Sequence, residues 1–133
     1  MLARGVRKKC ARCGGGNLFT SWFKMRERCP TCGYRFDRGT SSGFFLGAYM
    51  LNLVVSEMAL GVVLIILIVH AASSHIPSWW PYIVAAVITQ ITVPLIFYPW
   101  SKTIWAAFDL LVMPPSAVDE AEAIVSRAER DIT

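Results

Sequence analysis

Polar and apolar positions divide the chain into a polar N-terminal segment, two long apolar runs and a charged tail. Residues 44–69 contain one charged side chain, Glu57, and residues 76–101 contain none. A helix over residues 44–69 would be roughly 39 Å long, and the hydrocarbon core of a bilayer is about 30 Å thick. The pattern therefore predicts two transmembrane helices rather than the core of a soluble domain.

The second run is predicted to cross the membrane from about Pro81 to Pro99 and to continue as an interfacial extension to residue 113. Lys102 and Asp109 follow Pro99 and are seven residues apart, so a helix would place both on one interfacial face. We expect a hairpin made of a helix over 44–69, a short extracytoplasmic turn over 70–80 and a helix over 81–113.

The tail, residues 116–133, is predicted to form an acidic amphipathic helix. Its apolar residues recur every three or four positions, at Val118, Ala121, Val125, Ala128 and Ile132. Five acidic and two basic residues give it a formal charge of −3. It could dock on the basic N-terminal segment or on another protein, or it could remain a frayed, solvated helix, and the pattern does not choose between these.

All four cysteines lie in the N-terminal segment, as two C-x-x-C pairs separated by fifteen residues: Cys10, Cys13, Cys29 and Cys32. This spacing is typical of a four-cysteine zinc site. Gly14 and Gly33 each follow a pair, where the turn often needs a positive φ. Four thiolates would fill the tetrahedron of one Zn²⁺, so the ion would be structural. Structural disulfides and a dithiol redox site are the alternatives.

Residues 18–26 are rich in strand-forming types, so one or two short strands are expected there and another from residue 34. Residues 1–40 would then be a small zinc ribbon, joined to the first apolar run by a linker at 39–43. The predicted fold is an α-helical membrane protein with an N-terminal small β zinc ribbon, a two-span transmembrane hairpin and a C-terminal amphipathic helix.

The first 40 residues carry ten basic and two acidic side chains, a formal charge of +8. Positive charge beside a span stays in the cytoplasm, and the predicted turn contains no Lys or Arg. We therefore expect a multi-pass protein of the cell membrane, plasma or bacterial inner, with both termini cytoplasmic. The reducing cytoplasm would also keep the thiols ready for zinc. Basic charge suits anionic lipid, with nucleic acid as the competing partner.

The first apolar run contains two notable polar residues, Asn52 and Glu57. A carboxylate near mid-membrane costs a few kcal/mol on insertion scales. Glu57 is therefore either a proton, ion or partner site, or a protonated or hydrogen-bonded residue of helix packing. Neither span contains a basic partner, which favours the packing interpretation.

Four motifs give the chain a family resemblance: Cys10-x-x-Cys13-Gly14, Gly16-x-Leu18-Phe19, Cys29-Pro30-x-Cys32-Gly33-x-x-Phe36 and Pro99-x-x-Lys102. Together with the hairpin, they resemble the Domain of Unknown Function 983 family over roughly residues 8–108. The resemblance implies no established activity. Some members of that family are associated with respiratory oxidase assembly, so the resemblance implies a similar association here.

No catalytic constellation or phosphate-binding loop is recognisable, so an enzyme and a small-molecule substrate are not expected. Aromatic and basic residues between the cysteine pairs are candidates for partner binding: Phe19, Trp22, Phe23, Lys24 and Arg26. We expect a module that docks a membrane protein complex. Metal or thiol delivery to a membrane enzyme is the first alternative, nucleic-acid binding by the ribbon the second, and transport through Glu57 the last.

Overall fold

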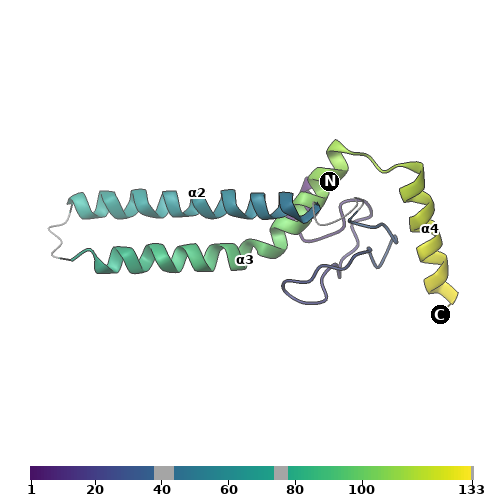
Figure 1. The fold of residues 1–133 in the computed structure, drawn as a ribbon, viewed down its shortest axis with the longest axis horizontal. Helices are drawn as coiled ribbons and strands as arrows, with labels where there is room; N and C mark the ends of the chain where they lie inside the picture. The colour runs from purple at the N-terminus through teal and green to yellow at the C-terminus, as the bar shows by residue number, and fades with distance from the viewer. Residues whose placement is uncertain (38–43, 74–77, 133) are drawn as a thin grey trace. The chain divides into compact units, whose positions relative to one another are not determined.

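The computed structural model describes residues 1–37, 44–73 and 78–132. Within these ranges there are four helices: α1 (Leu2–Val6), α2 (Phe44–Ser73), α3 (Trp80–Val112) and α4 (Ala117–Ile132) (Figure 1). The predicted linker at 39–43 and residues 74–77 of the predicted turn lie outside the described residues.

The chain forms two compact units. The first comprises Met1–Tyr49 and Pro99–Thr133, and the second comprises Met50–Tyr98. Both long helices run from one unit into the other. By length and composition, Leu46–Ser73 and Trp80–Val112 are long and apolar enough to cross a membrane.

In the second unit, polar side chains join α2 to α3. The Asn52 amide donates a hydrogen bond to the Pro94 carbonyl oxygen at 3.2 Å. Further along α2, Glu57 Oε1 accepts a hydrogen bond of 2.7 Å from Gln90 Nε2. Glu57 thus has a hydrogen-bond partner on the neighbouring helix, as the packing interpretation requires.

In the first unit, the cysteine-bearing segment, residues 10–37, packs on the C-terminal part of α3; we call this segment the head. Its buried side chains include Leu18, Met25, Tyr34 and Phe36. They form one apolar cluster with Ala106, Ala107 and Leu110 of α3. The small alanines allow the head to approach the helix closely.

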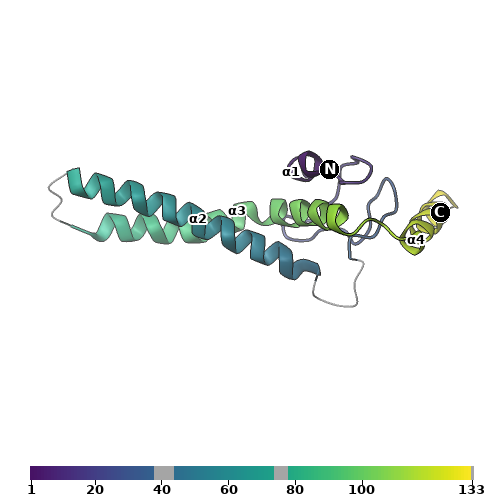
Figure 2. The ribbon, with the colours of Figure 1, turned by 90° about the horizontal axis from the view of Figure 1, so that it is seen from above.

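Helix α1 lies against the same part of α3 (Figure 2). A Cβ atom at Gly5 would be only 2.8 Å from the Thr103 carbonyl oxygen and 3.0 Å from the Ala107 Cβ. Glycine is therefore required at this crossing. The sequence pattern did not predict α1.

The predicted strands are not confirmed, because residues 1–37 contain only two isolated antiparallel bridges, Phe19–Met25 and Arg28–Arg35. Each bridge closes a tight loop: the first encloses residues 20–24 and the second encloses the Cys29–Cys32 pair. Turns this short leave little chain to extend a ladder. In place of the predicted β ribbon, residues 1–37 form two loops, each closed at its base by one β-bridge.

Candidate metal centre

The two cysteine pairs form turns with the same hydrogen bonds, which we call the first and second knuckle. In the first, the amide of Gly14 donates to the Cys10 carbonyl at 2.8 Å, and the Cys10 amide donates to the Gly15 carbonyl at 2.8 Å. In the second, Gly33 donates to Cys29 at 3.0 Å, and Cys29 donates to the Tyr34 carbonyl at 2.8 Å. Identical spacing in the sequence thus becomes identical backbone hydrogen bonding.

The glycine after each pair has the conformation that the sequence predicted. Gly14 has a φ of +78° and Gly33 a φ of +72°. Residues with a Cβ rarely adopt this region, whereas glycine does so without steric cost. In the first knuckle the Gly15 amide also points at the Cys13 sulfur, at 3.3 Å.

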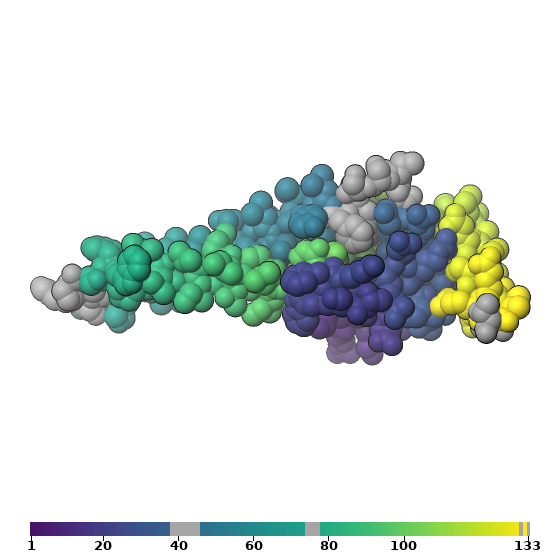
Figure 3. Space-filling view, turned by 60° about the horizontal axis from the view of Figure 1, so that its bottom comes forward, coloured from purple at the N-terminus to yellow at the C-terminus, as the bar shows by residue number. Residues whose placement is uncertain are grey.

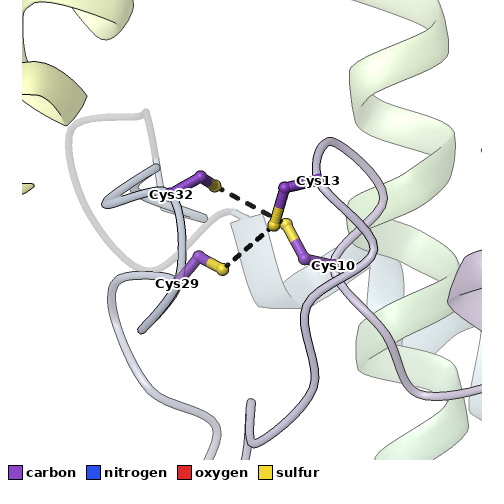
Figure 4. A group of neighbouring side chains, drawn as sticks. All are labelled: Cys10, Cys13, Cys29 and Cys32. Carbon is purple, nitrogen blue, oxygen red and sulfur yellow. Dashed lines mark hydrogen bonds between the residues drawn. The ribbon is translucent and has the colours of Figure 1, made fainter.

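The four cysteine sulfurs converge on one point (Figure 4). All lie within 4.8 Å of one another. The Cys13–Cys29 separation is 3.7 Å and the Cys10–Cys32 separation is 4.0 Å. A tetrahedron with metal–sulfur bonds of about 2.3 Å has edges of about 3.8 Å. The cluster therefore has the size and donor set to hold one metal ion.

The thiols influence one another's ionisation because they are crowded. The Cys10 thiol, acting as a hydrogen-bond donor, lowers the pKa of Cys29 to about 4. The same interaction, together with burial, raises the pKa of Cys10. Burial raises the pKa of Cys32 to about 11. Four thiolates this close repel one another, so a bound cation is what would allow all four to ionise.

Access to the sulfurs is uneven. Cys10 and Cys29 are fully buried, Cys32 is partly buried, and Cys13 is exposed. The Arg4 guanidinium of α1 donates to the Arg12 carbonyl at 2.9 Å, which holds the first knuckle from outside.

The candidate partner-binding residues occupy different environments. Phe19 packs against the apolar cluster. Trp22 and Phe23 are 48% and 51% exposed. Lys24 is also exposed, and Arg26 Nε donates to the Asn17 carbonyl at 3.1 Å.

Two lysines connect α3 with the N-terminal part of the chain, and sequence reasoning anticipated neither contact. Lys102, predicted to be interfacial, is only 8% exposed, and its Nζ donates to the Phe23 carbonyl at 2.9 Å. Lys8 Nζ lies 4.2 Å from the centroid of the Trp100 ring, a cation–π contact. Asp109 is partly buried on α3.

The tail forms α4 and packs on the head (Figure 3). Its contacts reach both knuckles. Glu120 pairs with Arg12 at 3.0 Å and Glu122 pairs with Arg28 at 3.2 Å. Ser126 Oγ donates to the Gly33 carbonyl at 3.1 Å. The opposite formal charges of tail and head were the signal for this contact, which the sequence left undecided.

The fold and the site define the class of protein. It has two helices long and apolar enough to cross a membrane and a four-cysteine centre able to hold a metal ion. The family model described as "Protein of unknown function (DUF983)" matches residues 19–109, and the chain belongs to this family. The match includes the second knuckle and ends before α4, and the first knuckle precedes it. Neither a curated protein nor a solved structure matches the chain.

Proposed function

We propose that the protein is a membrane-anchored docking module. In this proposal, a structural zinc ion organises a head on the cytoplasmic face of the cell membrane, and the head binds a membrane protein complex. The observation that carries the proposal is the convergence of all four sulfurs within 4.8 Å of one another, in a head whose loop at residues 20–24 exposes aromatic side chains.

Zinc is the metal proposed because the donors are four sulfurs at tetrahedral spacing. Such a set selects zinc or iron, and zinc is the usual occupant of a closed structural site. The residues that would hold it are Cys10, Cys13, Cys29 and Cys32. The ion would contribute folding free energy and cross-link two loops that have little strand structure of their own.

A membrane setting is supported by the exposure of apolar residues along both long helices. Leu53 and Ile65 on α2 are 52% and 63% exposed, and Ile88 and Ile96 on α3 are 57% and 53% exposed. A soluble protein rarely leaves apolar surface of this extent in water. The basic head next to the first span favours the cytoplasmic side for both termini.

The proposed docking face is the loop at residues 20–24 with its neighbours. Trp22 and Phe23 supply apolar contact area, and Lys24 and Arg26 supply positive charge beside it. Aromatic residues and arginine dominate binding energy in protein interfaces. The Lys102 hydrogen bond holds the loop in one place before a partner arrives, which lowers the entropic cost of binding.

Purification of the tagged protein in a native detergent would test this function, with measurement of bound metal and copurifying proteins. We expect one zinc per chain and a stable membrane complex, with the complex lost in Cys29→Ser and in Trp22→Ser/Phe23→Ser. Val62→Ser, on the exposed face of α2, is a control for loss of apolar surface. If Trp22→Ser/Phe23→Ser keeps every copurifying protein, the loop at residues 20–24 is not the docking face.

Metal delivery is the second candidate, favoured by the exposure of Cys13. An exposed ligand gives an acceptor thiol a place to attack. Transfer of zinc to a chelator within seconds would favour delivery, whereas retention over hours would favour a structural ion.

A further inference from the structure

Helix α4 binds the head through its small and polar face and leaves its apolar residues largely exposed. Val118 and Val125 line a shallow hollow beside Arg28 of the head. Ala123 is 2% exposed and lies against the second knuckle, with Ser126 one turn further on. On another face, Val118, Val125 and Ile132 repeat every seven residues and are 68%, 56% and 86% exposed. An amphipathic helix normally buries its apolar stripe, so here the docking contact is made by the other side.

The contacts of α4 are concentrated on the two knuckles. Glu120 reaches Arg12, which lies between Cys10 and Cys13. The guanidinium of Arg130 donates to the carbonyl of Pro30, which lies between Cys29 and Cys32. Each cysteine pair is thus contacted at a residue between its own ligands.

The closest approach is at Gly33, the positive-φ glycine of the second knuckle. A Cβ atom there would collide with the Ala123 carbonyl oxygen and the Ser126 hydroxyl. The absence of a side chain at Gly33 therefore allows both the turn after Cys32 and the close approach of α4. Any movement of this knuckle changes the surface on which α4 rests.

We propose that α4 is a clasp whose docking is coupled to the metal. Metal binding fixes both knuckles and so builds the surface that α4 needs. Docked α4 in turn holds the knuckles together and raises their affinity for the metal. This coupling of affinities is reciprocal by thermodynamic necessity. The inference rests on the zinc centre proposed above and adds that Ala123, Ser126 and Arg130 are positioning residues for it.

The coupling also controls the outward apolar stripe. Isolated helices shorter than about 12–15 residues are marginal in water even when alanine-rich, and α4 is only slightly longer, at 16 residues, several of them β-branched. Without the head, α4 would be less helical, and Val118, Val125 and Ile132 would share one continuous face for less of the time. Metal-loaded protein would then present this stripe more fully than metal-free protein.

Amide hydrogen exchange on the full-length protein in detergent micelles tests the clasp. With zinc bound, the amides of residues 117–132 should be protected. After removal of zinc by a chelator, they should exchange about tenfold faster or more. Equal exchange in the two states would overturn the proposal. Purified protein without bound metal would reject both the zinc centre and the clasp. Bound zinc with unchanged exchange in α4 would reject the clasp alone.

A pair of variants isolates the contact from the ligands. Ala123→Gln inserts a long side chain against Gly33, and Ala128→Gln makes the same change on the exposed face. In competition with a colorimetric chelator, Ala123→Gln should bind zinc at least about fivefold more weakly, within the usual range of coupling between sites. Ala128→Gln should bind zinc as the wild type does. Wild-type zinc affinity in Ala123→Gln would contradict the clasp.

Discussion

The side chain of Lys102 donates a hydrogen bond to the backbone carbonyl of Phe23, which precedes it by 79 residues. The bond joins α3 to the loop that carries the two exposed aromatic side chains. A lysine that sequence patterns place at the headgroup layer is instead buried beneath the head, where it fixes a loop.

Replacing Lys102 with methionine should therefore release the loop without removing a metal ligand. Hydrogen bonds to charged groups contribute about 1.5–3 kcal/mol, so amides in residues 20–24 should exchange about tenfold faster or more. Lys24→Met, on the exposed surface of the same loop, is the matched control and should leave exchange unchanged. If Lys102→Met also leaves it unchanged, the lysine does not hold the loop.

Three glycines in the head should respond differently to alanine. A Cβ atom added at Gly16 would meet open space. Gly14 has a positive φ, and an added Cβ atom would lie 3.7 Å from the nearest atom. Gly33 also has a positive φ, and an added Cβ atom would collide with α4. A left-handed conformation costs roughly 1–2 kcal/mol for a residue with a Cβ, so Gly14→Ala should weaken zinc binding about tenfold.

The same experiment separates strain from crowding. Gly33→Ala should weaken zinc binding more than Gly14→Ala, because it adds the collision with Ala123 and Ser126. Gly16→Ala should bind zinc as the wild type does. Competition with a chelator of known affinity measures all three. Equal affinities for Gly14→Ala and Gly33→Ala would mean that α4 does not press on the second knuckle.

The knuckles were predictable because their determinants are local. Two residues between the cysteines and a glycine after them specify the turn, so the sequence alone was enough to expect a positive φ at Gly14 and Gly33. The convergence of the four sulfurs followed from the repeated spacing. The strands did not follow, because strand propensity in residues 18–26 competes with tight loop closure, and one bridge closes the loop there.

The contacts with α3 and α4 were not predictable from local patterns. Lys102 and Phe23 lie far apart in sequence, and nothing around either residue points to the other. The apolar repeat of α4 correctly indicated a helix, but it did not indicate which face would contact the head. In the structure, two ion pairs and the buried Ala123 lie on the face that contacts the head, whereas Val118 and Val125 stay exposed.

The hydrogen bond between Glu57 and Gln90 leads to a prediction about the acidic residue in the first apolar run. Glu57→Gln should keep a hydrogen bond to Gln90 and unfold at the wild-type temperature in detergent. Glu57→Leu should lose the bond and about 0.6 kcal/mol, the average for such bonds in a membrane protein. Met58→Leu, at an exposed neighbouring position, is the control.

A functional carboxylate would give a different result. If Glu57 transfers protons or ions, Glu57→Gln should abolish flux in proteoliposomes while leaving stability intact. Loss of flux in this variant would contradict the packing role and favour transport. We expect no flux in the wild type or in Glu57→Gln. We also expect Glu57→Gln to form the proposed membrane complex as the wild type does.

The orientation of the chain can be tested with two complementary reporters. The ten basic residues before the first apolar run should hold the head in the cytoplasm, and an even number of spans would return the C-terminus to the same side. A phosphatase active only outside the cytoplasm should stay silent when fused to either terminus. A fluorescent protein that folds only in the cytoplasm should be bright at both. The phosphatase inserted after Ser73 is the positive control, since the segment between α2 and α3 should lie outside. Phosphatase activity at either terminus would reject this topology and would also remove the reducing environment on which the four free thiols depend.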